Sequence, residues 1–185
     1  MISYYTSIVE TDEEKDKIEY IYKNFYSFMA YTAGRVLNHN KQDVEDTVHN
    51  AMLKIIDIID KIDITETNKV KNLCGIIARN KAKDHCKLKD NQTVSLEEEF
   101  NNDKTEDNTD PINIVIQNDT YEIVLKAIYT LDEKYRDACI LKYVHGYKVN
   151  DIALILDISP ENVSRRIYRG KEAIKNNLRK EHLDV

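Results

Sequence analysis

Glycine and proline are scarce in this chain, which has four Gly and two Pro among its 185 residues. Strand-rich folds need many turn residues, so the composition favours an all-α fold. The three cysteines, Cys74, Cys86 and Cys139, show no metal-ligand spacing. A zinc site built from Cys74, His85 and Cys86 would lack the paired CxxC spacing of such sites. We therefore expect reduced thiols, no metal and no cofactor.

Long apolar runs are also missing, and none approaches the roughly 20 residues that a membrane-spanning helix needs. The first residues are polar and acidic, without the apolar centre of a signal peptide. We expect residues 1–17 to form an amino-terminal tail. We also expect a cytoplasmic location, with no direct insertion into a membrane.

The net charge of −6 conceals two basic regions. Residues 91–120 hold one Lys and eight acids, which gives −7. Residues 69–89 hold seven Lys or Arg and one Asp, and residues 163–180 hold seven Lys or Arg and one Glu, so each region carries +6. The potential at a surface depends on local charge rather than on the total, so both basic regions remain compatible with binding to a nucleic acid.

The first domain is expected to cover residues 18–90 and to be entirely helical, because its apolar residues recur at spacings of three and four. In chain order we expect a helix over residues 18–37, a polar break at 38–42, a helix capped by Asp43, a loop over 60–68, and a helix over 69–89. Residues 91–118 are rich in Asn, Asp, Glu and Thr, which is typical of a flexible acidic linker.

The second domain is expected to cover residues 119–180. Asp132 is placed to cap one of its helices, and Gly146 to end that helix. Residues 151–156 form a short amphipathic helix, and Asp157 follows in the turn, because Asp tolerates left-handed backbone geometry.

The next segment, residues 157–171, reads DISPENVSRRIYRGK and is the most informative in the chain. Ser159 is a preferred N-cap residue, and Pro160 fits the first position of a helix. Val163 and Ile167 are four residues apart and belong on the buried side of that helix. The whole unit therefore has the pattern of a helix-turn-helix.

Arg165 and Arg169 are four residues apart and share a different face of this helix, with Arg166 and Lys171 beside them. A helix that buries one stripe and presents paired arginines on another can enter a DNA major groove. The alternative is an ordinary helical pair with a solvated basic end.

Two further segments resemble bacterial sigma factors of the small two-domain, extracytoplasmic-function (ECF) class. Val44–Leu53 looks like the family's helix that docks on the RNA polymerase clamp, and Ile77–Asn80 looks like its motif beside the promoter-melting segment. Residues 131–178 look like its domain that reads the −35 element. Departures from the usual family residues suggest an unusual subgroup or an altered promoter preference, and they occur at His49, Asn50, Leu73, Lys148, Ser164 and Gly170.

The resemblance implies three sets of binding residues and no catalytic residue. Contacts to core RNA polymerase are implied for Glu45, Asp46, His49, Asn50 and Leu53. Contacts to the −10 element are implied for Arg79, Asn80, Lys81, Lys83 and Lys87. Contacts to the −35 element are implied for Ser164, Arg165, Arg166, Arg169 and Lys171. The implied partners are core RNA polymerase, promoter DNA and an anti-sigma factor.

Structural roles remain open for several of these residues. Glu45 and Asp46 can serve the positive end of their helix, and the lysines of 81–89 can form a solvated face. Arg79 can pair with an acid inside the bundle, and Arg166 can form a salt bridge within its own domain.

Two other functions compete with the sigma factor hypothesis. A free-standing helix-turn-helix regulator with an amino-terminal sensing or dimerising domain explains the carboxyl-terminal residues equally well. A DNA recombinase would need clustered arginines around a nucleophile, but the first 90 residues have only Arg35 and Arg79.

Overall fold

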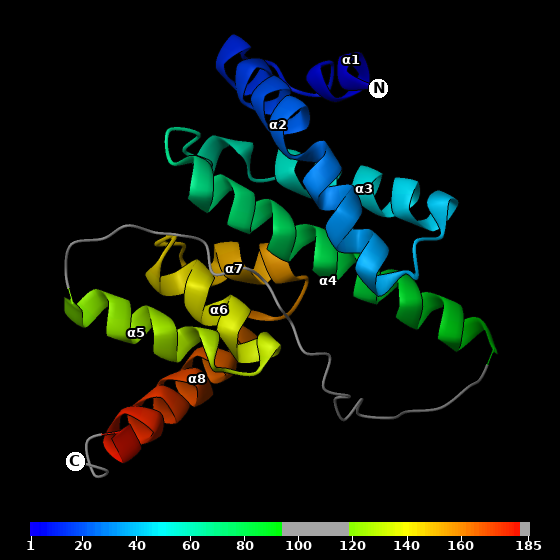
Figure 1. Ribbon diagram of the computed structural model, residues 1–185. Helices are drawn as coiled ribbons and strands as arrows, with labels where there is room; N and C mark the ends of the chain where they lie inside the picture. The colour runs from blue at the N-terminus through cyan, green and yellow to red at the C-terminus, as the bar shows by residue number, and fades with distance from the viewer. Residues whose placement is uncertain (94–118, 182–185) are drawn as a thin grey trace. The chain divides into compact units, whose positions relative to one another are not determined.

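The computed structural model describes residues 1–93 and 119–181 (Figure 1). The chain divides into two compact units, Met1–Ile114 and Val115–Val185. The described part of each unit is helical and contains no strand, which confirms the all-α class. Most of the expected acidic linker, including Glu97, Glu98 and Glu99, lies outside the described residues.

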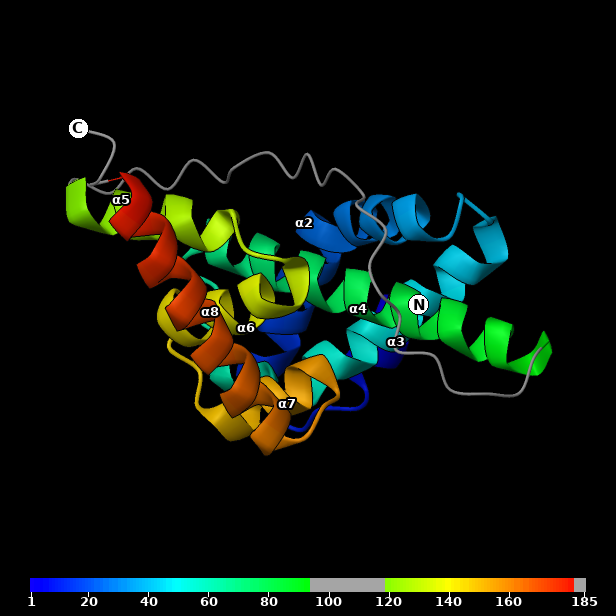
Figure 2. The same cartoon turned by 90° about the horizontal axis from the view of Figure 1, so that it is seen from below.

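Three long helices build the amino-terminal unit. Its elements are α1 (Ile2–Thr6), α2 (Asp12–Val36), α3 (Lys41–Ile56), a short 3-10 turn η1 (Ile59–Lys61) and α4 (Thr67–Thr93). The three long helices pack against one another, and Figures 1 and 2 show α2 crossing α4 with α3 beside them. The core is closed by large apolar side chains from all three, including Ile18, Ile21, Met29, Met52, Ile55, Leu73 and Ile77.

The amino-terminal residues do not form the expected tail. Thr11 caps α2, because its hydroxyl accepts a hydrogen bond from the Glu14 backbone N–H at 3.2 Å and the Glu14 carboxylate accepts one from the Thr11 N–H at 3.2 Å. This reciprocal cap starts the helix six residues before the expected position. Residues 2–6 form α1, which packs on α2 and α3 and buries Tyr5 completely.

The expected cap of α3 is also corrected. Asn40 is the N-cap residue, and its side-chain oxygen accepts a hydrogen bond from the Asp43 backbone N–H at 3.3 Å. Asp43 lies inside the first turn, where its carboxylate accepts from Lys89 at 2.6 Å and lies 3.1 Å from His85 Nε2. Chiefly because of the Lys89 bond, the pKa of Asp43 is below its usual range. Asp43 therefore links α3 to α4 and does not cap α3.

The segment between α3 and α4 is anchored by apolar side chains. Ile58, Ile59 and Ile62 are at most 3% exposed. The 3-10 turn begins within this segment, and α4 begins at Thr67, so the loop is shorter than expected. Asp63 closes its outer part, accepting hydrogen bonds from the Thr65 N–H at 2.9 Å and the Thr65 hydroxyl at 2.7 Å.

The carboxyl-terminal unit has four helices in its described part. They are α5 (Asp119–Tyr129), α6 (Glu133–Tyr143), α7 (Val149–Leu156) and α8 (Pro160–Glu181). Asp132 occupies the N-cap position of α6 but makes no side-chain cap hydrogen bond. Gly146 follows the end of α6 with a φ of +78°, a conformation that favours glycine.

The turn of the helix-turn-helix has the expected geometry. Asp157 adopts the left-handed conformation, with φ 51° and ψ 44°. The Ser159 hydroxyl accepts a hydrogen bond from the Asn162 backbone N–H at 3.3 Å, and Pro160 is the first residue of α8. Both the cap and the turn are therefore confirmed.

The structure explains why residue 170 is a glycine, which the sequence alone does not. It is buried where α8 crosses α6, and a Cβ atom there would lie 2.5 Å from the Cys139 sulfur and 3.4 Å from Leu131. Only a residue without a side chain allows this approach. Glycine destabilises a helix by about 1 kcal/mol relative to alanine. The close packing of α8 on α6 that glycine permits compensates for this cost.

Within residues 1–93 and 119–181, no helix combines the length and the apolar character needed to cross a membrane.

Candidate functional site

The outward face of α8 presents two of the expected −35 residues. Arg165 and Arg169 are both exposed and one turn apart, and the buried Val163 and Gly170 lie on another side of the helix. The guanidinium of Arg169 donates a long hydrogen bond, 3.4 Å, to the hydroxyl of Tyr135 on α6. This bond is the main cause of a lowered pKa at Tyr135. Tyr135, which is not among the expected site residues, therefore restrains one of the two arginines.

The other three expected −35 residues do not share this face. Arg166 is half-buried beside the row that holds Val163 and Gly170. Ser164 and Lys171 are exposed and seven residues apart, so they lie along a second side of α8.

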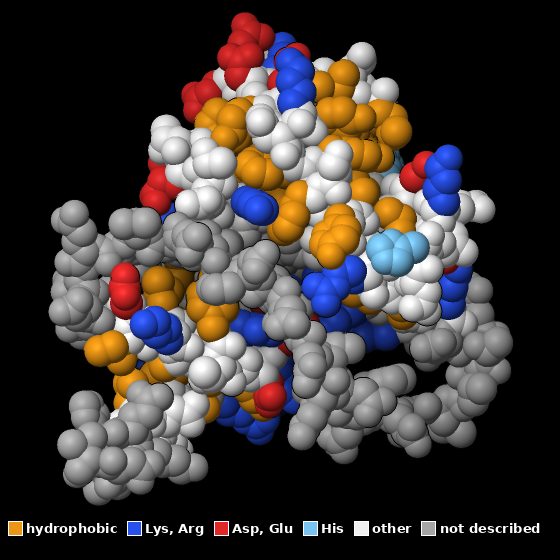
Figure 3. All heavy atoms as spheres, in the orientation of Figure 1, with side chains coloured by type: hydrophobic (Ala, Val, Ile, Leu, Met, Phe, Trp, Pro, Cys, Tyr) orange, Lys and Arg blue, Asp and Glu red, His pale blue; other side chains and the backbone are white. Residues whose placement is uncertain are grey.

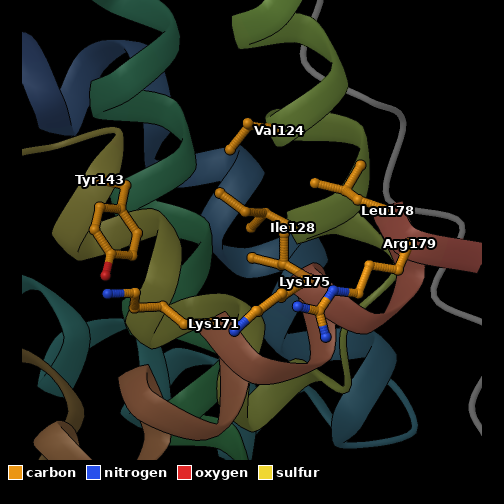
Figure 4. A pocket seen from close by; sticks show the side chains of 8 residues that line it. Val124, Ile128, Tyr143, Lys171, Lys175, Leu178 and Arg179 are labelled. Atoms are coloured by element: carbon orange, nitrogen blue, oxygen red, sulfur yellow. The ribbon is translucent and has the colours of Figure 1, made fainter. Parts of the chain in front are cut away.

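Lys171 contributes to a groove between α5 and α8, shown in Figure 4. The groove has a volume of about 790 Å³. Its apolar lining comes from three helices and consists of Val124, Ile128, Tyr143, Ile174 and Leu178. Lys171, Lys175 and Arg179 repeat every four residues and place a row of cations along one border. An apolar floor beside a positive row suits an amphipathic segment with acidic residues on one flank.

The expected polymerase-binding residues share one face of α3. Their spacing of one and four residues places them in two adjacent rows. Glu45, Asp46 and Asn50 are exposed, whereas His49 and Leu53 are half-buried. Lys41 is 4.0 Å from Glu45, which is a weak surface ion pair. The face is therefore acidic at its start and less polar toward Leu53.

An aromatic cluster borders this face. The Tyr5 hydroxyl lies 2.9 Å from His49 Nδ1, and the His49 ring is 5.8 Å from the Tyr4 ring and 5.6 Å from the Tyr5 ring. Tyr22 and Tyr26 continue the cluster along α2. Burial, followed by the neighbouring tyrosines, raises the pKa of Tyr5 to about 12. Figure 3 shows hydrophobic side chains gathered over this part of the amino-terminal unit.

The expected −10 residues lie along the second half of α4. Four of the five are half-buried, namely Arg79, Asn80, Lys81 and Lys83. Lys87 is exposed and lies 3.3 Å from Asp84 in an ion pair on the same helix. The Nδ2 atom of Asn80 is buried without a hydrogen-bond partner among the described residues. The five residues form a basic surface on α4, but most of them also pack partly against the helical bundle. A structural role for each therefore stays open.

Two of the three cysteines, Cys74 and Cys139, are buried in the cores of the two units. Burial raises the pKa of Cys74 to about 12 and that of Cys139 to about 11. Such thiols stay protonated and are poor nucleophiles and metal ligands. No group of three or more His, Cys, Asp or Glu side chains in this part of the chain is placed to hold a metal ion.

One family model matches part of the carboxyl-terminal unit. Residues 121–174 match the family described as Sigma-70, region 4. The chain is 33% identical over 69 residues to the ECF RNA polymerase sigma factor SigW of Bacillus subtilis, a match that covers 37% of each chain. It is 33% identical over 70 residues to the ECF RNA polymerase sigma-E factor of Escherichia coli K12, covering 38% of this chain and 37% of that protein. The matches thus span just over a third of these relatives' length.

Among solved structures, the chain is similar to CnrH in its complex with the cytosolic domain of CnrY, with 14% identity. That alignment covers 97% of this chain and 95% of CnrH, with a TM-score of 0.36.

Proposed function

We propose that this chain is an ECF sigma factor, which binds core RNA polymerase and directs promoter-specific initiation of transcription. The carboxyl-terminal helix-turn-helix reads the −35 element, and the amino-terminal unit recognises and melts the −10 element. The observation that carries the proposal is the capped helix α8 with Arg165 and Arg169 exposed on one face, within a segment that matches Sigma-70, region 4.

For the −35 element, α8 enters the major groove with its arginine face toward the bases. A guanidinium can form two parallel hydrogen bonds to O6 and N7 of guanine, a contact worth about 1–3 kcal/mol of discrimination. Arg165 and Arg169 are assigned to this role. Arg166, Ser164 and Lys171 lie on other sides of α8, where contacts to phosphate fit better than contacts to base edges.

For the −10 element, the basic residues of α4 hold phosphates while unstacked bases are captured nearby. The loop that follows Ile62 is the proposed receptor for a flipped base, because its apolar anchors leave the outer residues exposed. Arg79, Asn80, Lys81, Lys83 and Lys87 are the residues proposed to contact this element.

For core polymerase, the exposed acidic start of α3 is the proposed contact. Glu45 and Asp46 supply negative charge, and His49, Asn50 and Leu53 extend the same surface. The synthesis of RNA is the reaction of the polymerase, and this chain contributes binding only. The proposed place of action is the cytoplasm.

We place an anti-sigma factor on the groove between α5 and α8. The occupant that fits is an amphipathic helix with apolar residues on one face and acids on its flank, opposite the cations of α8. A triple change of Lys171, Lys175 and Arg179 to Gln should weaken capture of such a helix while leaving the apolar lining intact. Unchanged binding would remove the cation row from the proposal.

Run-off transcription with purified core polymerase across a promoter library tests the function directly. The chain should co-purify with core polymerase and should confer transcription from a subset of promoters. A free-standing regulator would instead bind DNA tightly by itself and would not associate with core polymerase. Failure to associate with core polymerase would therefore favour the regulator.

A further inference from the structure

The contact between α1 and α3 joins residues that are 44 positions apart in the chain. Tyr5 is fully buried, and its hydroxyl lies 2.9 Å from Nδ1 of His49. His49 belongs to the α3 face that we propose as the contact for polymerase. The opposite ring nitrogen, Nε2, has no hydrogen-bond partner among the described residues.

The direction of this hydrogen bond follows from the burial of Tyr5. A buried phenol hydrogen needs an acceptor, and within residues 1–93 and 119–181 the ring of His49 is the one partner of the Tyr5 hydroxyl. If Nδ1 donated instead, the phenol hydrogen would be buried without an acceptor, which would disfavour that arrangement by about tenfold or more. The phenol therefore donates to Nδ1, and the ring hydrogen of neutral His49 is on Nε2.

The aromatic neighbours fix the plane of the His49 ring as well. The Tyr4 and Tyr5 rings are inclined to it by 37° and 35° at centroid distances below 6 Å. The centroid of the Tyr22 ring lies 5.9 Å from that of Tyr5 and 4.9 Å from that of Tyr26, so rings from α2 also pack in this cluster. The ring is thus held by packing as well as by the hydrogen bond.

We propose that Tyr5 is a positioning residue for the polymerase-binding face: it holds His49 with Nε2–H outward, so that this nitrogen donates a hydrogen bond to an acceptor oxygen of core RNA polymerase. This inference rests on the proposed function. It assigns α1, through Tyr5, a role in orienting the proposed polymerase-binding face.

Tyr5→Phe in the full chain tests the proposal, because it keeps the buried ring and removes only the hydroxyl. Nitrogen-15 NMR of labelled histidine at pH 8 should show the Nε2–H tautomer at His49 in the wild type and a mixture of tautomers in Tyr5→Phe. The dissociation constant for core polymerase should rise by roughly three- to tenfold, as expected for one hydrogen bond. Tyr31→Phe is the matched control, since Tyr31 is exposed, lies outside the aromatic cluster, and its hydroxyl makes no hydrogen bond in the described residues.

A double-mutant cycle with His49→Ala separates positioning from a general effect on the fold. If Tyr5 acts through His49, adding Tyr5→Phe to His49→Ala should cause no further loss of binding to core polymerase. Additive losses would overturn the proposal, as would a changed tautomer with unchanged affinity. If neither the wild type nor Tyr31→Phe binds core polymerase, the proposed function fails, and the inference fails with it. A loss confined to Tyr5→Phe and His49→Ala would support both.

Discussion

The packing of α8 on α6 through Gly170 leads to a quantitative prediction for Gly170→Ala. The added Cβ would lie 2.5 Å from the Cys139 sulfur, a distance that real Cβ contacts essentially never show. Cys139 is fully buried, so its sulfur has little room to move. The two helices must therefore separate, or the cysteine must adopt another rotamer.

Two opposing terms set the size of the effect. Alanine is favoured over glycine inside a helix by about 1 kcal/mol. Overpacking of a close-packed core costs about 1–3 kcal/mol. We expect a net destabilisation of the carboxyl-terminal unit of about 1 kcal/mol, which corresponds to a fall of about 4–8 °C in the melting temperature of a domain of this size.

Differential scanning calorimetry of the full chain, with hydrogen exchange of α6 and α8 peptides, measures this loss. Combining Gly170→Ala with Cys139→Ala removes the opposing sulfur, so the alanine at 170 should cost less in that background, with a coupling of about 0.5–3 kcal/mol. Gly75→Ala is the control, since its nearest neighbour is the ring of Phe28 at 3.1 Å, which is only half-buried and can move. A gain in stability from Gly170→Ala with Cys139 present would refute the reasoning.

Three further predictions concern the binding faces and the link between α3 and α4. Replacing Arg165 or Arg169 with Ala should cost about 1–3 kcal/mol in −35 recognition and relax preference at one base, as measured by transcription from −35 variants; a uniform loss across variants would indicate phosphate contacts instead. Asp46→Arg should abolish binding to core polymerase in a pull-down while circular dichroism stays unchanged, and melting would identify Asp46 as a helix-start residue. Because the pKa of Asp43 is lowered in the folded state, its ionised carboxylate stabilises the fold fully above about pH 4, and this stabilisation is lost as the pH falls further. Asp43→Asn should therefore make the free energy of unfolding, measured as a function of pH, fall less steeply at acid pH.

Local patterns in the sequence were sufficient to predict most of the helices. The cap at Ser159, the left-handed turn at Asp157 and the exposed pair Arg165 and Arg169 each depend on residues within one or two turns of the chain, and these predictions are confirmed as structure. The roles of the arginines in binding DNA stay a prediction.

The features that were missed depend on contacts between distant residues. Asp43 and Asn40 are both good caps by residue type, but Asp43 instead reaches Lys89 on another helix. The burial of Tyr5 depends on His49, far along the chain, and a five-residue helix has no measurable periodicity. Lys171 borders a groove only because α5 packs beside α8, which no local pattern could reveal.

The segment between α3 and α4 separates the residues that hold the fold from those that would touch DNA. Ile58, Ile59 and Ile62 are inserted into the core, whereas Asp63, Thr65 and Glu66 are exposed and bond mainly within their own turn. Substitutions in the outer residues should leave the core untouched, so under the proposed function promoter preference could change without a loss of stability. If the outer turn reads the promoter as proposed, it could be exchanged for other sequences to direct the protein to new promoters while the helical scaffold is kept.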